Sequence, residues 1–178
     1  MSNSNSLHYQ LCCEGAKYII QPRATEPWRA QNMLSTVELV CFGCELTDVY
    51  ATNRETSTVI EVKVSHADFL NDKKKFARSK QAEVSKMQLG NFRYYLCPEG
   101  VINPEELPEG WGLLYWDGKK VNKVVPAPKY WETDHKYDMF VLCSIIAREC
   151  GTHKVFNYRQ NDTTTRNNHW NTPSHQRR

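Results

Sequence analysis

Apolar residues recur along the chain with the spacings of helices and strands. Between Leu7 and Gln21 they line one side of a helix, which is closed by Pro22. A second helix is expected from His66, with Ser65 as its N-cap, and a third from Trp131 to Cys150. The segments of strand character are residues 37–42, 47–52, 58–64, 92–97, 111–116 and 120–125, the last two joined by the Asp117-Gly118 turn.

The order of these elements predicts the fold class. One helix is followed by three strands, a helix, a strand, a hairpin and a last helix. We therefore expect an α/β sandwich around a central mixed sheet flanked by helices. Residues 1–150 would form a single domain, and the polar residues 151–178 a flexible tail.

Two charges interrupt the most apolar of the expected strands. Glu61 and Lys63 stand two positions apart and share one face, while Ile60, Val62 and Val64 share the other. The apolar face can pack into a core. The charged face then points away from this core, and what it faces decides the function of the protein.

A turn at residues 53–56 sets how this strand pairs with the one before it. Counting back from the turn, position 50 faces 59 and Asp48 faces Glu61. Cross-strand neighbours have Cβ atoms about 5 Å apart. Asp48, Glu61 and Lys63 are therefore expected to converge on one patch.

Two carboxylates at this separation repel each other, and a raised pKa or a bound cation relieves the repulsion. Hard oxygen ligands of this kind suit Mg²⁺ or Mn²⁺. A lysine beside them supplies positive charge for a phosphoryl transition state or orients the attacking water. The set is suited to hydrolysis of a phosphodiester.

Asp48, then Glu61-Val62-Lys63 after a turn and a following helix, resembles the PD-(D/E)XK nuclease superfamily. Three longer runs, residues 60–74, 90–100 and 107–115, are similar to its branch related to the MmcB DNA-repair protein. The resemblance extends over roughly residues 10 to 128. It implies a restriction-endonuclease-like three-layer sandwich and a Mg²⁺- or Mn²⁺-dependent DNA nuclease that acts in repair, recombination or restriction-like processing.

The resemblance also implies roles for individual residues. Asp48 and Glu61 would ligate the divalent metal, with the Val62 carbonyl as a third ligand, and Lys63 would be the catalytic lysine.

A further ligand is implied on the first helix. Glu14 matches the place where many members carry an additional acidic residue, with Glu38 and Glu45 as nearby alternatives. Thr47 stands where the superfamily name has proline, a position at which proline is often missing.

The lysines at 73–75 follow the strand of Lys63 on the next helix. They form either a solvated helix face or contacts to the phosphate backbone of DNA. Single-stranded, double-stranded and branched DNA stay open as partners, and so does a homodimer, because many relatives of this fold pair up to cut two strands. Five aromatic residues offer either stacking surfaces for unpaired bases or core side chains: Tyr94, Tyr95, Trp111, Tyr115 and Trp116.

Composition narrows these alternatives only slightly. The net charge of +3 permits nucleic-acid binding without requiring it. No apolar stretch approaches the roughly 20 residues of a membrane helix, and the seven cysteines lie mostly in apolar contexts, so we expect a cytoplasmic protein with no membrane partner. The pair Cys41 and Cys44 lacks the second half of a zinc site. Two rival functions are a non-cleaving nucleic-acid-binding module and a structural or partner-binding domain.

Overall fold

The computed structural model describes residues 6–21, 34–39, 47–53, 55–79, 89–130 and 135–150, with the main chain alone for 73–79. Two compact units divide the chain, Met1–Ile145 and Ile146–Arg178. The first unit contains the sheet and all of the candidate site. Of the second unit, the described part is the end of the last helix.

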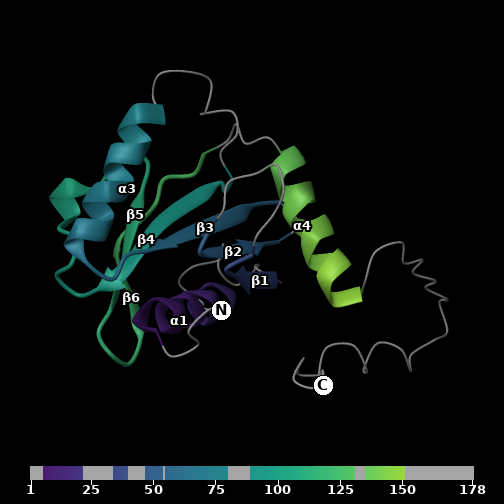
Figure 1. Cartoon of the computed structure of the whole chain (residues 1–178), viewed down its shortest axis with the longest axis horizontal. Coiled ribbons are helices and arrows are strands. Elements are labelled where there is room, and N and C mark those ends of the chain that lie inside the picture. Colours follow the sequence, from purple (N-terminus) through teal and green to yellow (C-terminus); the bar gives the residue numbers. More distant parts are fainter. Residues whose placement is uncertain are drawn as a thin grey trace. The chain divides into compact units, whose positions relative to one another are not determined.

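The elements follow the predicted order (Figure 1). The helices are α1 (Leu7–Ile20), α3 (His66–Ser79) and α4 (His135–Cys150), with a 3₁₀ turn η2 (Pro104–Glu106). The strands are β1 (Leu34–Val37), β2 (Val49–Thr52), β3 (Ser57–Val62), β4 (Phe92–Pro98), β5 (Gly112–Trp116) and β6 (Val121–Val125). The Ser65 hydroxyl accepts a hydrogen bond from the Asp68 main-chain nitrogen at 3.2 Å, which confirms Ser65 as the start of α3.

Within the described residues, six strands form one mixed sheet in the order β1-β2-β3-β4-β5-β6. Neighbours from β1 to β3 are antiparallel, β3 to β5 are parallel, and β6 is antiparallel to β5. Helix α3 lies in the crossover from β3 to the parallel β4 (Figure 1). The predicted α/β fold around a mixed sheet is confirmed.

Helix α1 covers one face of the sheet. Its buried residues Leu11 and Ile19 share a core with Ile60 and Val62 of β3. At Gly15 the helix approaches so closely that an added Cβ would lie 2.9 Å from a side-chain carbon of Leu96. This face is the apolar one predicted for β3.

The opposite face of the sheet packs against α3 and α4. Phe69 of α3 belongs to the same buried cluster as Tyr95 of β4. Tyr137 and Val141 of α4 belong to a second cluster, which contains Val59 of β3. Side chains alternate along a strand, so Glu61 shares this face with Val59. The fold is thus a three-layer sandwich, and Glu61, the charged residue of β3, lies on the side of α3 and α4.

The first strand was predicted in the wrong place. The sequence favoured residues 37–42, but β1 is Leu34–Val37. Glu38 has a φ of 46°, and this left-handed backbone cannot continue a strand. Residues 40–46, with Cys41 and Cys44, and the expected tail 151–178 lie outside the described residues.

The cysteines within the described ranges are free; they are Cys12, Cys13, Cys97, Cys143 and Cys150. In the same part of the chain, none of the helices combines the length and apolar character needed to cross a bilayer.

Candidate functional site

Asp48 and Glu61 come together at one end of the β2–β3 pair. The observed register pairs Tyr50 with Val59, as predicted, and its continuation sets Asp48 opposite Glu61. Asp48 stands one residue before β2, and its Oδ2 accepts a hydrogen bond from the main-chain nitrogen of Val62 at 2.7 Å. The aspartate is therefore anchored to the strand that carries the glutamate.

Lys63 follows directly after β3, and its side chain is only 8% exposed. Its main-chain nitrogen donates to the Leu96 carbonyl at 2.9 Å, which continues the pairing with β4. The Nζ atom lies 3.4 Å from Glu61 Oε2 and 3.6 Å from Asp72 Oδ1. The ammonium group is thus held between a carboxylate of the sheet and one of α3.

Asp72 is a member of the site that the sequence patterns did not reveal. While Oδ1 faces Lys63, Oδ2 accepts a hydrogen bond from the Tyr95 hydroxyl at 2.9 Å. The Tyr95 ring is stacked on Trp111 with centroids 4.3 Å apart and meets the edge of Phe69 at 5.2 Å. A rigid aromatic cluster therefore fixes the carboxylate that contacts the lysine.

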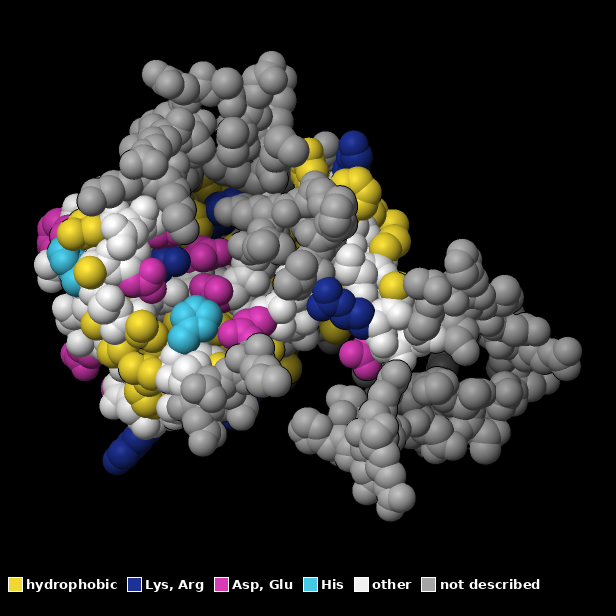
Figure 2. All heavy atoms as spheres, viewed as in Figure 1, with side chains coloured by type: hydrophobic (Ala, Val, Ile, Leu, Met, Phe, Trp, Pro, Cys, Tyr) yellow, Lys and Arg dark blue, Asp and Glu magenta, His cyan; other side chains and the backbone are white. Residues whose placement is uncertain are grey.

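Acidic groups outnumber basic ones around Lys63. Burial alone would lower the pKa of its ammonium group, but the negative charges of Glu61, Asp72, Asp48 and Asp68 together outweigh burial and raise the pKa. Lys63 is therefore charged at neutral pH. Acidic side chains also gather on the face shown in Figure 2, next to a histidine. The excess of negative charge favours a bound cation.

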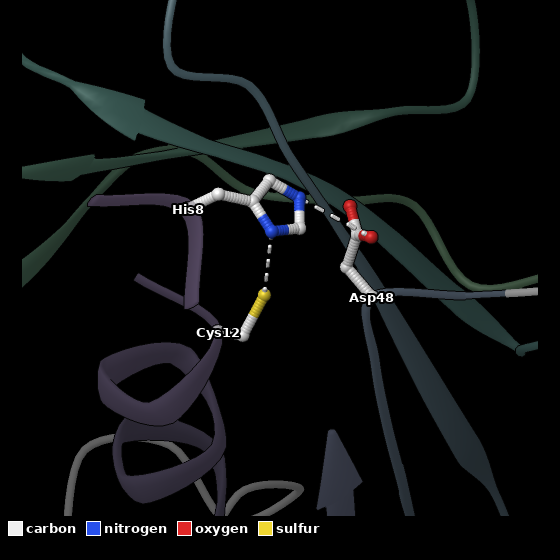
Figure 3. A group of neighbouring side chains, drawn as sticks. All are labelled: His8, Cys12 and Asp48. Atoms are coloured by element: carbon white, nitrogen blue, oxygen red, sulfur yellow. Dashed lines mark hydrogen bonds and ion pairs between the residues drawn. The ribbon is translucent and has the colours of Figure 1, made fainter. Parts of the chain in front are cut away.

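His8 and Cys12 are the residues of α1 that lie next to Asp48 (Figure 3). His8 Nε2 is 3.4 Å from Asp48 Oδ1, and Nδ1 is 3.6 Å from both Cys12 Sγ and Glu38 Oε1. Burial, followed by the negative charges of Asp48 and Glu38, raises the pKa of the Cys12 thiol. The one signal for this cluster in the sequence is the spacing of four between His8 and Cys12, which places both on one helix face.

Glu14, predicted as a further metal ligand, has a different contact in the structure, and its role stays a prediction. Its Oε1 accepts a hydrogen bond from Lys17 Nζ at 2.7 Å. At 3.6 residues per turn, Glu14 lies about 120° around α1 from His8. Glu38, one of the two alternatives, is close to the site, because its main-chain nitrogen donates to the Asp48 carbonyl at 2.9 Å. Glu45 lies outside the described residues.

The structure tests only some of the residues predicted to contact nucleic acid. Lys73, Lys74 and Lys75 directly follow Asp72 on α3, and their side chains lie outside what the structure describes. Contact between these lysines and DNA stays a prediction. Three of the aromatic residues suggested for stacking, Tyr94, Tyr95 and Trp111, are instead buried core side chains.

Comparison with known proteins gives a fold and no function. The chain matches no protein-family model and no curated protein. Among solved structures it is similar to the SPO1766 protein of unknown function from Silicibacter pomeroyi, with a TM-score of 0.54 and 21% sequence identity. The match covers 86% of this chain and 99% of that chain. At this identity the likeness establishes the fold alone.

Proposed function

We propose that this protein is a divalent-metal-dependent DNA nuclease that hydrolyses phosphodiester bonds at Asp48, Glu61 and Lys63. The observation that carries the proposal is the convergence of these three residues. Asp48 is bonded at 2.7 Å to the strand of Glu61, and the buried Lys63 ammonium lies 3.4 Å from the Glu61 carboxylate. The three-layer sandwich is also the fold that the resemblance to PD-(D/E)XK nucleases implies.

The donor set fits Mg²⁺ or Mn²⁺. The oxygens of Asp48 and Glu61 are hard ligands. Asp48 Oδ2 accepts the main-chain bond from Val62, while Oδ1 faces the His8 ring, and the carboxylates around Lys63 leave negative charge to neutralise. The Val62 carbonyl stays the predicted third ligand. When bound, such an ion stabilises charge on the phosphoryl group and acidifies its water ligands.

Lys63 would act as a fixed positive charge and hydrogen-bond donor. Because the surrounding carboxylates raise its pKa, the ammonium keeps its proton at neutral pH and is not a base in the metal-free protein. Its charge can stabilise the phosphate oxygens in the transition state or hold the attacking water. Glu61 and Asp72 orient it from two sides, which makes Asp72 a positioning residue.

The described cysteines are free, which fits a reducing compartment. We propose a cytoplasmic enzyme that acts on DNA in repair, recombination or restriction-like processing. The lysines at 73–75, next to Asp72 on α3, would contact the DNA backbone.

Incubation of the full chain with labelled single-stranded, double-stranded and branched DNA tests the function. We expect cleavage of at least one substrate in Mg²⁺ or Mn²⁺ and none with a chelator, read on denaturing gels. If the protein retains DNA but does not cleave it in any of the metals, the proposed nuclease is wrong and the protein is a nucleic-acid-binding module. Absence of retention at low salt would favour a domain with no nucleic-acid role.

Asp72→Asn should lower kcat by about tenfold or more and leave KM for DNA nearly unchanged, because the lysine loses one of its two charged partners. The amide can still accept the Tyr95 hydrogen bond. Since the Asp72 charge raises the Lys63 pKa, the alkaline limb of the pH profile of kcat should move to lower pH.

A matched control for this variant is Asp138→Asn on α4. It alters a similar bond, in which the Tyr50 hydroxyl donates to Asp138 Oδ1 at 3.0 Å. We expect its kcat to match the wild type. Equal losses of kcat in both variants would show that Asp72 supports the fold and does not position Lys63.

A further inference from the structure

We infer that His8, Cys12 and Asp48 form a binding site for a thiophilic divalent transition-metal ion of the Zn²⁺ or Co²⁺ class. One ligand atom from each side chain lies within 4.8 Å of the others. His8 sits between its partners, with one ring nitrogen facing Cys12 Sγ and the other facing Asp48 Oδ1 (Figure 3). The site shares Asp48 with the proposed nuclease centre but offers nitrogen, sulfur and oxygen in place of oxygen alone.

Two different elements hold these ligands in place. His8 and Cys12 are four residues apart on α1, the spacing with which a helix presents two ligands to one ion. The Ser6 hydroxyl accepts from the Tyr9 main-chain nitrogen at 3.2 Å and caps the turn that carries His8. Asp48 is held from the sheet by its bond to Val62. The elements that carry the ligands are therefore held in place before any ion arrives.

The three ligand atoms are close enough together to reach the geometry of a zinc site by a small movement. Zinc bonds of about 2.3 Å to sulfur and about 2.0–2.2 Å to nitrogen and oxygen place tetrahedral ligand atoms about 3.4 to 3.6 Å apart. The two contacts of the His8 ring measure 3.6 Å to Cys12 Sγ and 3.4 Å to Asp48 Oδ1. Only one ring nitrogen can bind the ion, so the three atoms need to close in by roughly 1 Å. Side-chain rotation can supply this movement.

The surroundings also suit an ion. His8 and Asp48 are 33% and 23% exposed, so an ion can reach the cluster from their side although Cys12 is buried. Glu38 Oε1 lies 3.6 Å from His8 Nδ1, so this carboxylate adds negative charge beside the cluster. On binding, the Cys12 thiol would release its proton to solvent.

The same residue types occur in cysteine nucleophile sites, but the burial of Cys12 argues against that use. Its exposed fraction is 0%, so a substrate cannot reach the sulfur. A single metal ion is small enough to bind at such a position.

Titration of the full chain with Co²⁺, without DNA and under a phosphine reductant, tests the inference. Cobalt bound by a thiolate has a near-ultraviolet charge-transfer band, and we expect this band to saturate at one ion per chain. Cys12→Ala should abolish the band, and His8→Ala should weaken binding by at least about tenfold. Cys13→Ala is the matched control, since it is the next cysteine and lies outside the cluster, and it should keep the band.

Three results would overturn the inference: no near-ultraviolet band in the wild type, a band that survives Cys12→Ala, or a band lost in a Cys41→Ser/Cys44→Ser variant. Circular dichroism checks that each variant folds, and Cys12→Ser replaces Cys12→Ala if the latter does not. Cleavage in Mg²⁺ is measured separately. DNA cleavage without a sulfur band refutes this site alone, and a sulfur band without cleavage refutes the nuclease alone.

Discussion

Asp48→Asn should reduce kcat/KM for metal-dependent DNA cleavage by about 10³-fold while the protein stays folded. Asparagine has nearly the same shape, and its amide oxygen can still accept the 2.7 Å hydrogen bond from Val62. The substitution therefore removes the charge that a metal ion needs and keeps the structural bond. Cleavage rates and the thermal unfolding midpoint, measured on the same preparation, separate the two effects.

Neighbouring substitutions make this test specific. Asp48→Ala removes the acceptor as well, and a partly buried main-chain nitrogen left without a partner should cost about 1–3 kcal/mol of unfolding free energy. Glu61→Gln should reduce cleavage about as strongly as Asp48→Asn does. Glu55→Gln, an exposed site near the turn between β2 and β3, should leave cleavage unchanged. A kcat/KM close to the wild-type value in Asp48→Asn would rule out the proposed centre.

Lys63→Met should abolish cleavage and also lower the free energy of unfolding by about 3 kcal/mol at neutral pH. Methionine fills much of the same space but leaves Glu61 and Asp72 without their shared ammonium group. Both carboxylates are largely buried, at 13% and 23% exposed. Urea denaturation at pH 7 measures the loss. Lys17→Met is the control, because its pair with Glu14 is on the surface and should contribute little.

The stability difference between wild type and Lys63→Met should depend on pH with a definite sign. The folded-state pKa of Lys63 is raised above the ordinary 10.5. Its contribution is therefore fully present below about pH 10.5 and is lost as the pH rises through the folded-state value. The unfolding free energies of the wild type and of Lys63→Met should therefore converge in alkaline solution. A difference that stays constant up to strongly alkaline pH would show that packing, not charge, makes Lys63 stabilising.

The register at the site could be predicted because it depends on nearby residues. Asn53 closes the turn between β2 and β3, since its main-chain nitrogen donates to the Thr56 carbonyl at 3.0 Å and its side chain accepts from the Thr56 nitrogen at 2.7 Å. A short turn fixes the pairing of the strands that it joins. Counting from it was enough to set Asp48 opposite Glu61.

Contacts between distant elements could not be predicted in this way. Asp72 reaches Lys63 because α3 crosses over the sheet, and it is fixed by Tyr95, 23 residues further along the chain. His8 meets Asp48 only once α1 has packed against the strands. The local pattern of apolar residues contains no information about the contact of Asp72 with Lys63 or of His8 with Asp48. The shift of β1 has a different cause, the left-handed backbone of Glu38, which no apolar pattern reveals.

Asp48 lies one residue outside β2 and is tied to the sheet by a bond that asparagine can also make. In the genetic code, aspartate and asparagine codons differ by a single nucleotide. A gene for this protein is therefore one point mutation away from a version that keeps the same fold but has lost the negative charge at position 48. Under the proposed function, that mutation would convert a nuclease into a protein that binds DNA without cleaving it. Because folding would be little affected, a loss of stability would not select against the mutation.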